Sequence, residues 1–179
     1  MTYLWTYQTP EGFSDMGMTS DGQSLTGLWF LGSRDERKHD GAGERRELPV
    51  FRQTSDWLDM YFAGGRPDFM PPWELRDLTP FRREVMEALL AIPYGETTTY
   101  GAIAAALAAK RGQGRMSARA VGGAVGWNPL CILIPCHRVV GSAGSLTGYG
   151  GGLRNKLALL RLEGADLTGF TVPTRGTAL

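Results

Sequence analysis

Residues that bind metals or form disulfides are scarce in this sequence. Its 179 residues include two cysteines, Cys131 and Cys136, and two histidines, His39 and His137. Two cysteines five positions apart on an extended segment are poorly placed for a mutual disulfide, and no compact metal-ligand spacing is visible. We therefore expect reduced cysteines, no metal site and no bound cofactor.

Long apolar runs are also absent. No window approaches the roughly 20 apolar residues that a membrane helix needs, and the N-terminal stretch MTYLWTYQTPEG lacks the basic and then apolar layout of a signal peptide. The hydrophobic content of 42% can still form a real core, and the length suits one large or two small domains. These features predict an intracellular, cytoplasmic protein that has no membrane partner.

Acidic residues become rare after Ile92. Residues 1–92 carry 10 Lys and Arg against 15 Asp and Glu, a net charge of −5, whereas residues 93–179 carry 9 against 3, a net charge of +6. A basic half is a candidate binder of polyanions such as nucleic acid. Uneven drift of surface charge would produce the same numbers, so charge alone leaves both interpretations open.

The first part of the chain has the pattern of a small sheet followed by a helix. Three partly apolar stretches within residues 3–32 are separated by TPEG and TSDGQS, and they predict antiparallel strands. The highly charged segment 33–47 is expected to be an exposed loop. Mostly helical spacing of apolar residues begins at Pro49 and stops at the glycine pair that starts with Gly64.

A second helix is expected after a connector rich in proline. Thr79 can cap it, Pro80 suits its first turn, and apolar residues recur on one of its faces. Beyond PYGETT the chain contains fewer acids and more alanine and glycine. We therefore place a domain boundary at Pro93, between an N-terminal domain of residues 1–92 and a second domain of residues 93–179.

Two short helices joined by a turn open the second domain. Thr99 can cap a helix that runs to Lys110, and Ser117 can cap a second one, ARAVGGAVGW, which Asn128 and Pro129 end. In a basic region this pair resembles a helix-turn-helix, which places its second helix against DNA, although helical hairpins are common. LCILI predicts a short buried strand, GSAGSLTGYGGG a glycine-rich loop and LRNKLALLRLEG a closing helix.

The residues next to Cys136 favour a reactive thiol at this position. Pro135 denies a ladder hydrogen bond and should end the preceding strand, so the thiol falls where side chains become available to ligands. His137 could take the thiol proton, but adjacent residues in an extended chain point to opposite faces, so a turn or a bridging water is needed. Glu163, one of three acids after Ile92, is the natural group to orient this histidine. The set suggests a cysteine hydrolase or transferase, and a packed structural pair is the alternative.

Several segments resemble a known family. RAVGGAVGWNP, ILIPCHRVVGSAGSLTGYGGGL and LEG, with PYGETTTYG upstream, are similar to motifs of the O6-alkylguanine-DNA alkyltransferases, also called methylated-DNA-protein-cysteine methyltransferases. The resemblance is very specific from Pro93 to Gly164. It implies an α/β (α+β) fold in which a small ribonuclease H-like domain, a three-stranded antiparallel sheet plus a helix, precedes a mainly helical winged-helix or helix-turn-helix-like DNA-binding domain.

The activity implied by the resemblance is direct-reversal DNA repair. The alkyl group of O6-alkylguanine in double-stranded DNA would move once, irreversibly and without a cofactor, onto the protein's own cysteine after the nucleotide is flipped out. The partner is then damaged duplex DNA, and the protein is expected to be a monomer in solution. O4-alkylthymine as a second substrate and cooperative assembly on DNA stay open.

Four positions match residues of the family's chemistry. Cys136 matches the acceptor thiolate of the PCHRV motif, His137 matches the water-bridged base, and Glu163 matches the acid that orients this histidine. Asn128, in WNP, matches the asparagine that braces the turn between the recognition helix and the active-site strand.

Further positions match residues that bind substrate and DNA. They are Tyr100, Arg119, Tyr149, Ser117, Gly122 and Gly123. Tyr100 matches the tyrosine that helps to rotate the nucleotide out, Arg119 the arginine that fills the space it leaves, and Tyr149 the aromatic wall of the guanine pocket. Gly122 and Gly123 would let the helix backbone come close to the sugar-phosphate wall, with close helix packing as the equal alternative. The family uses this helix in the minor groove.

The chain departs from the family pattern in the turn AAKRGQGRMSAR, which is longer than expected. We hypothesise that Lys110, Arg111 and Arg115 contact phosphate there. Zinc-bearing relatives have N-terminal cysteine and histidine ligands. This chain has only His39 before residue 131, so we expect no zinc.

Three other functions remain as alternatives. A non-catalytic alkyltransferase-like protein binds damaged DNA without chemistry, but such proteins carry tryptophan at the position of Cys136. A helix-turn-helix regulator that senses alkylation or oxidation through Cys136 would bind a specific operator. A cysteine hydrolase would turn over more than one equivalent of substrate per protein.

Overall fold

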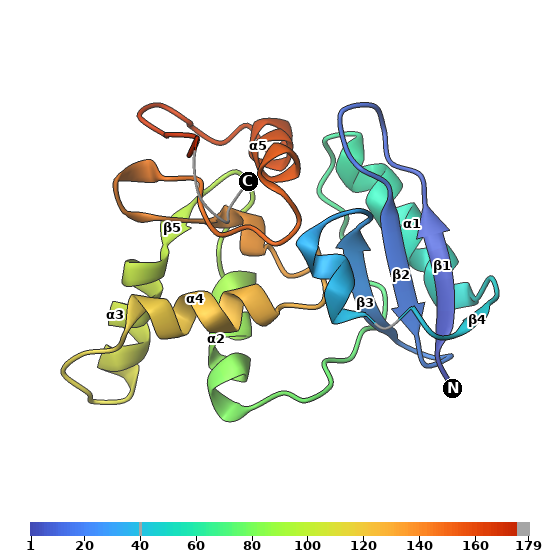
Figure 1. Ribbon diagram of the computed structural model, residues 1–179, viewed down its shortest axis with the longest axis horizontal. Helices are drawn as coiled ribbons and strands as arrows, with labels where there is room; N and C mark the ends of the chain where they lie inside the picture. Colours follow the sequence, from blue (N-terminus) through green and yellow to red (C-terminus); the bar gives the residue numbers. More distant parts are fainter. Residues whose placement is uncertain (40, 175–179) are drawn as a thin grey trace. The chain divides into compact units, whose positions relative to one another are not determined.

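The computed structural model describes residues 1–39 and 41–174, and the chain forms two compact units that divide between Asp77 and Leu78. Figure 1 shows a small sheet in the first unit and a largely helical second unit. The mixed α/β fold predicted from the sequence is therefore confirmed. Over the described ranges, no helix combines the length and the apolar character needed to cross a membrane.

A four-stranded sheet dominates the first unit. In the spatial order β3-β2-β1-β4, its strands are β1 (Tyr3–Tyr7), β2 (Met16–Ser20), β3 (Leu25–Phe30) and β4 (Glu44–Arg45). The first three pair antiparallel, as predicted, but β4 adds a parallel partner to β1, so the predicted three-stranded sheet was one strand too small. The segment 33–47, predicted as a loop, contains β4 and the 3-10 helix η1 (Arg34–Lys38).

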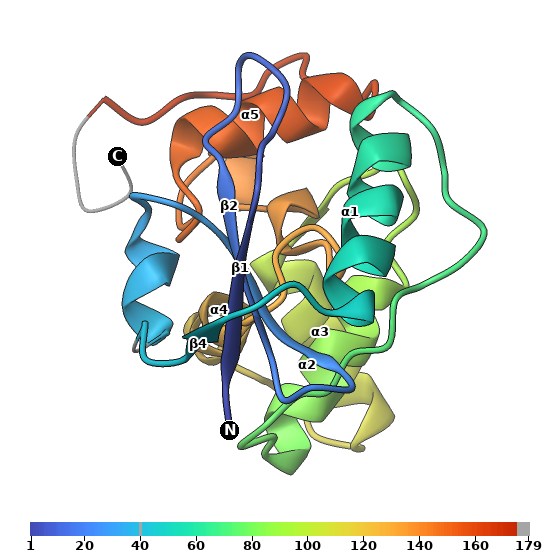
Figure 2. The ribbon, with the colours of Figure 1, turned by 90° about the vertical axis from the view of Figure 1, so that its right-hand side faces the viewer.

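Helix α1 (Pro49–Phe62) lies along one face of this sheet (Figure 2). It begins at Pro49 and ends before Gly64, as the sequence predicted. The core of the unit includes Phe51 of α1 and Met16 and Phe30 of the strands, none of which has any exposed surface. Burial of each such side chain contributes about 1.5–3 kcal/mol to stability.

Four helices build most of the second unit. They are α2 (Pro80–Leu90), α3 (Tyr100–Lys110), α4 (Ala118–Trp127) and α5 (Leu153–Leu162). The side chains of Thr79, Thr99 and Ser117 cap the first three by accepting backbone N–H groups at 3.2, 3.0 and 3.3 Å. The capping predictions are therefore confirmed.

Helix α2 packs within the second unit, against α3 and α4. From the sequence we expected this helix in the N-terminal domain, with the boundary at Pro93. The structure differs because the apolar face of α2, which includes Val85 and Leu89, is buried. The guanidinium of Arg82 also lies 4.5 Å from the ring centroid of Trp127 in α4. The boundary at Pro93 was predicted from a change in amino-acid composition, which does not show how α2 packs.

Two short strands position the residues around Cys136. β5 (Thr98–Thr99) pairs in parallel with β6 (Val139–Val140), and β5 runs directly into α3. β6 directly follows the 3-10 helix η2 (Cys136–Arg138). The pairing therefore brings the first residue of α3, Tyr100, to the segment that carries Cys136.

Candidate active site

A compact turn carries the chain from α4 to Cys136. Residues 130–134, predicted as a buried strand, are buried but form a turn. The Asn128 side chain, itself 1% exposed, holds this turn: Nδ2 donates to the Ile134 carbonyl at 2.9 Å, and Oδ1 accepts from the Leu130 N–H at 3.0 Å. The strand prediction was wrong because a short apolar run has no period that identifies its backbone conformation.

The backbone of this turn is sharply bent at two places. Ile132 has φ 70°, a region that β-branched residues rarely adopt. Pro135 lies at φ −80° and ψ 62°, and the N–H of Cys136 donates across it to the carbonyl of Ile134 at 2.8 Å. A conformation such as that of Ile132 costs about 1–3 kcal/mol and persists only where the surrounding structure fixes it, often at active sites.

Cys136 and His137 lie in the 3-10 helix η2, not in an extended strand. Consecutive side chains of such a helix are about 120° apart, because it has three residues per turn. The turn that the sequence argument required between the thiol and the imidazole is therefore present. Both side chains are buried, with 6% of Cys136 and 0% of His137 exposed.

The His137 ring is held by Glu163, the residue that caps α5. His137 Nε2 lies 2.7 Å from Glu163 Oε1. The carboxylate also accepts from Arg138, Nε to Oε2 at 2.8 Å and Nη2 to Oε1 at 2.9 Å, and from the N–H of Gly95 at 3.2 Å. Arg138 Nη1 donates to the Ile92 carbonyl at 2.7 Å. This paired guanidinium offsets the burial of the carboxylate and fixes its orientation.

The protonation of His137 follows from these contacts. Burial lowers the pKa of His137, and this effect exceeds the opposing influence of Glu163. A neutral imidazole that faces a carboxylate through Nε2 carries its proton there, so Nδ1 presents a lone pair. Nδ1 is buried and forms no hydrogen bond to any residue that the structure describes. His137 can therefore accept a proton at Nδ1, and Glu163 can stabilise the imidazolium that results.

Tyr100 and Lys156 are titratable neighbours of Cys136. Burial, with a smaller contribution from the charge of Cys136, raises the pKa of Tyr100 to about 12. Burial lowers the pKa of Lys156 to about 8, against the charge of Cys136, which acts to raise it. At neutral pH Tyr100 is therefore a protonated phenol and Lys156 carries an ammonium group.

Two glycines lie beside the Tyr100 ring, and one of them, Gly148, leaves room for it. A Cβ at Gly122 of α4 would lie 3.8 Å from ring atom Cδ1, and a Cβ at Gly148 would lie 3.1 Å from the hydroxyl. Gly148 also has φ +79°, which favours glycine. A Cβ at Gly122 would make only ordinary van der Waals contact with this ring, so this packing does not require a glycine. Tyr149, the next residue after Gly148, is 4% exposed.

Gly123 lies in a different environment from Gly122. Arg119, Gly123 and Gly126 are exposed and follow one another at helical spacing on one face of α4. A Cβ at Gly123 or Gly126 would meet no atom within 4 Å, so the helix backbone is open to close approach from outside. Arg119 stands in the first turn of this helix, two residues after the Ser117 cap.

The cationic turn after α3 is partly tied to α2. Arg111 donates to both carboxylate oxygens of Glu84 at 3.0 Å, and Lys110 Nζ lies 4.0 Å from Glu87. Two of the three cations of our phosphate hypothesis therefore already have acidic neighbours. Arg115 is the member of the three that best fits the hypothesis.

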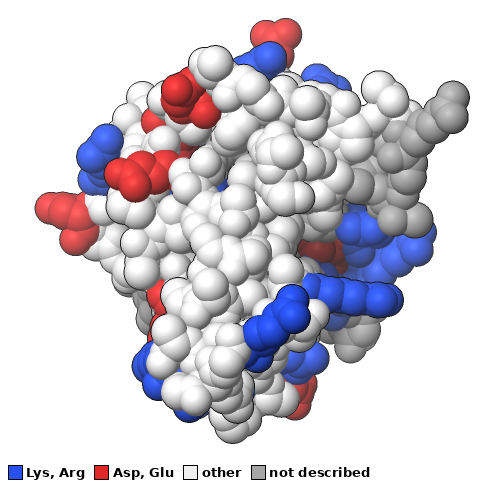
Figure 3. Space-filling view, turned by 90° about the vertical axis from the view of Figure 1, so that its left-hand side faces the viewer, with Lys and Arg blue, Asp and Glu red and all other residues white. Residues whose placement is uncertain are grey.

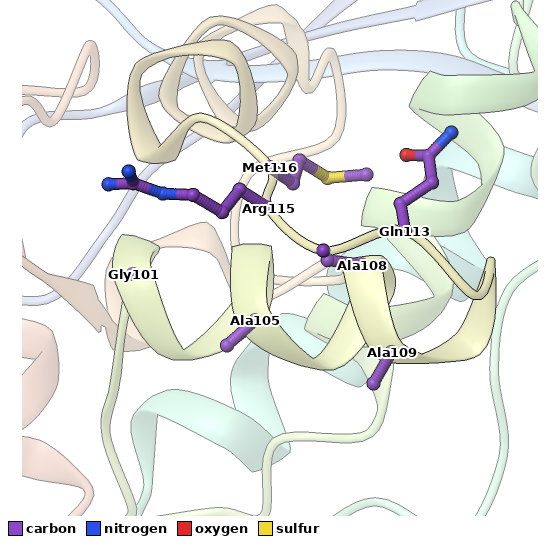
Figure 4. Close-up of a pocket in the computed structure, with 8 residues that line it drawn as sticks. Gly101, Ala105, Ala108, Ala109, Gln113, Arg115 and Met116 are labelled. Carbon is purple, nitrogen blue, oxygen red and sulfur yellow. The ribbon is translucent and has the colours of Figure 1, made fainter.

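Arg115 borders a hollow of about 320 Å³ along α3. Figure 4 shows its other walls, which are small residues of α3 and the side chains of Gln113 and Met116. None of the predicted site residues lines this hollow. Over residues 1–39 and 41–174, no group of three or more His, Cys, Asp or Glu could hold a metal ion.

Sequence reasoning missed three residues of the site: Arg138, Gly95 and Lys156. Arg138 and Gly95 lie inside the motifs PCHRV and PYGETTTYG, but their hydrogen bonds to Glu163 depend on the fold. Lys156 carried a signal of its own, because it occupies an apolar face of α5 between Leu153 and Leu160.

Comparison with known proteins decides the family. The family model for the 6-O-methylguanine DNA methyltransferase DNA-binding domain matches residues 80–165. A methylated-DNA-protein-cysteine methyltransferase of Methanosarcina acetivorans is 45% identical over 167 residues, which cover 91% of this chain and 99% of that protein. One from Mycobacterium bovis is 50% identical over 125 residues, 68% of this chain and 72% of that protein. The chain belongs to the methylated-DNA-protein-cysteine methyltransferases.

Solved structures of this methyltransferase family have the same fold. The crystal structure of Mycobacterium tuberculosis OGT in complex with DNA has a TM-score of 0.76 and 38% identity, and the match covers 93% of this chain and 98% of that one. The O6-methylguanine-DNA methyltransferase of Pyrococcus kodakaraensis has a TM-score of 0.62 and 30% identity, with 92% and 100% covered. The fold and family predicted from the sequence are therefore confirmed.

Proposed function

We propose that this methyltransferase repairs O6-alkylguanine in duplex DNA by transferring the alkyl group to Cys136. The observation that carries the proposal is the buried Cys136-His137 pair, whose imidazole presents Nδ1 while Glu163 holds Nε2 at 2.7 Å. Buried polar atoms are usually hydrogen-bonded, so a histidine that only packs would be expected to use both ring nitrogens.

In the net reaction the methyl group moves from the purine to the sulfur of Cys136, and one proton leaves the thiol while the purine gains one. A water between Cys136 and His137 passes the thiol proton to Nδ1, which leaves the thiolate as the nucleophile. Its sulfur attacks the methyl carbon, and the carbon–O6 bond breaks with its electron pair on the purine. The purine takes up one proton from water, and His137 returns the thiol proton to water. Tyr100, which keeps its proton at neutral pH, supplies a hydrogen bond to the leaving purine. The products are S-methylcysteine and guanine, and the protein is spent.

The target base must leave the stack before the thiol can reach it. Extruding a nucleotide costs about a few kcal/mol. Arg119, exposed on the first turn of α4, fills the space left in the duplex, and the open backbone at Gly123 lets this helix approach the groove. Tyr149 forms a wall of the pocket for the flipped base, and Asn128 keeps the turn to Cys136 in place.

Positive charge supports binding to the DNA backbone. Figure 3 shows the face on the α3 side, where Lys and Arg side chains gather at the lower and right margins and the middle carries no charge. Phosphate contacts position such a protein, and the lesion supplies selectivity, so affinity should fall steeply with salt.

Because its substrate is DNA, we place the protein in the cytoplasm of the cell.

The test is a titration of an O6-methylguanine duplex with increasing protein. Guanine restored per protein molecule should reach one and stop there. Turnover beyond one equivalent would identify a hydrolase. Tight, lesion-selective binding with no restored guanine would identify a non-catalytic damage-binding protein instead.

A further inference from the structure

The glycine-rich loop of residues 141–152, here called the pocket loop, carries Tyr149, the wall of the proposed base pocket. Six of its twelve residues are glycine, so its own sequence allows many backbone conformations. Local propensity therefore does not fix where Tyr149 stands. Contacts from another part of the chain have to hold the loop in place.

The chain beyond α5 supplies such contacts through residues 167–171, here called the C-terminal strap. Thr171 forms an isolated parallel bridge with Ser145 of the pocket loop. The N–H of Leu146 donates to the Thr171 carbonyl at 3.0 Å, and the N–H of Thr171 donates to the Gly144 carbonyl at 3.0 Å. Two backbone hydrogen bonds thus join the strap to the middle of the pocket loop.

The side chain of Phe170 packs at the same place. It is half-buried and lies against the apolar cluster that includes Leu146 and Leu160. A Cβ at Gly144 would lie 2.8 Å from ring atom Cδ1 of Phe170 and 3.0 Å from the carbonyl oxygen of Gly169. Gly144 also has φ +76°. The close fit of the strap and the backbone of the loop therefore both require glycine at this position.

The contact with the strap lies close to the residues that would meet the base. Leu146 is three residues before Tyr149, and three residues of chain span at most about 11 Å. Between them is Gly148, where a Cβ would lie 3.1 Å from the hydroxyl of Tyr100. A shift of the loop at Leu146 would therefore move the pocket wall and the backbone beside Tyr100 together.

We propose that Phe170 is a positioning residue of the transfer, which with the backbone of Thr171 holds the pocket loop so that Tyr149 meets the flipped base. The inference rests on the proposed function. It makes the C-terminal strap a support of the base pocket. The strap acts on the rate of transfer through the pocket loop, and leaves the contacts of α4 with DNA as they are.

The test is Phe170→Ala in the full chain, which removes the ring and keeps the backbone. Hydrogen exchange, followed by peptide mass, should become faster in the pocket loop and stay the same in α4. Single-turnover transfer from an O6-methylguanine duplex, at saturating protein and well below the melting temperature, should slow by about tenfold to a hundredfold, because small misplacements of a bound group cost that much. The affinity for an undamaged duplex should not change, and the stoichiometry should still reach one.

Three further variants separate positioning from general stability. Phe170→Leu keeps an apolar contact with the cluster and should recover most of the transfer rate. Thr171→Pro removes the N–H that donates to Gly144 and keeps the ring, and it should also slow transfer. Val172→Ala changes the next residue along the chain, which is 49% exposed, and should alter none of these measurements.

Four results would decide against the inference or against its basis. Wild-type transfer by a folded Phe170→Ala protein would overturn it, and so would slower transfer without faster exchange in the pocket loop. Unfolding of both Phe170→Ala and Thr171→Pro would overturn it as well, because the strap would then serve folding alone. If wild-type protein transferred no methyl group, the proposed function would fail, and hydrogen exchange would still decide whether the strap holds the loop.

Discussion

The replacement Glu163→Gln tests how the imidazole is held. The Glu163 carboxylate accepts from His137, twice from Arg138 and once from Gly95, at 2.7 to 3.2 Å. Glutamine has the same shape, but it offers one acceptor oxygen and turns an NH2 group toward these donors. Arg138, whose side chain is 11% exposed, would lose its anion. His137 would lose the contact that fixes its tautomer.

The size of both effects follows from the burial of this cluster. Removing one partner of a buried ion pair costs about 3–5 kcal/mol, out of a total stability of about 5–15 kcal/mol. For a chain of this length the melting temperature should fall by about 6–20 °C. The rate of methyl transfer should fall by about 10²-fold or more, because an oriented general base contributes about that much. The stoichiometry should still reach one, since Cys136 remains.

Two assays measure these effects. Thermal unfolding by circular dichroism gives the melting temperature, and single-turnover transfer from an O6-methylguanine duplex, well below both melting temperatures, gives the rate. Asp166→Asn is the matched control, because Asp166 is an exposed acid whose Oδ1 accepts from the Thr168 N–H at 2.9 Å, and it should change neither quantity. A folded Glu163→Gln protein that transferred methyl at the wild-type rate would refute the role of Glu163.

Three further predictions concern the turn, the recognition helix and pH. Asn128→Ala leaves a buried carbonyl and a buried N–H without partners and should lower the free energy of unfolding in urea by about 2–5 kcal/mol; a loss below 1 kcal/mol would contradict the bracing role. Gly123→Ala adds a Cβ in open space and should stabilise α4 by about 0.5–1 kcal/mol while weakening binding to duplex DNA, and unchanged affinity would argue against close approach of this helix. Because burial lowers the pKa of His137 below 6.5, the unfolded chain binds the proton first and stability should fall as the pH drops below about 6.5. Urea unfolding between pH 5.5 and 7 should show that the free energy of unfolding depends less on pH in His137→Asn than in the wild type. An equal dependence in both proteins would mean that another group titrates.

The local features of this protein could be read from the sequence. Thr79, Thr99 and Ser117 begin helices because a cap needs only its own side chain and the next turn of backbone. Glu163 could be singled out because acids are rare in the second half of the chain. Cys136 and His137 stood out by their motif, and the comparisons bear out the family that this motif indicates.

Features that depend on packing could not be read in the same way. Residues 130–134 form a turn because the Asn128 side chain supplies the hydrogen bonds that a neighbouring strand would have supplied. The contacts of Gly95 and Arg138 with Glu163 join segments about 70 and 25 residues apart in the chain. The boundary predicted at Pro93 assigned α2 to the wrong unit. The composition of the buried face of α2 does not indicate which unit the helix packs in.

Peptide mass analysis after reaction with a duplex that carries one O6-methylguanine tests the central claim most directly. The account predicts a gain of one methyl group per protein molecule, confined to the peptide that contains Cys136 and lost in Cys136→Ser. Cys131 lies five residues before Cys136 and is 1% exposed. It serves as the internal control and should stay unmodified. A methyl group on Cys131, or none on either cysteine while the DNA is still bound, would contradict the account.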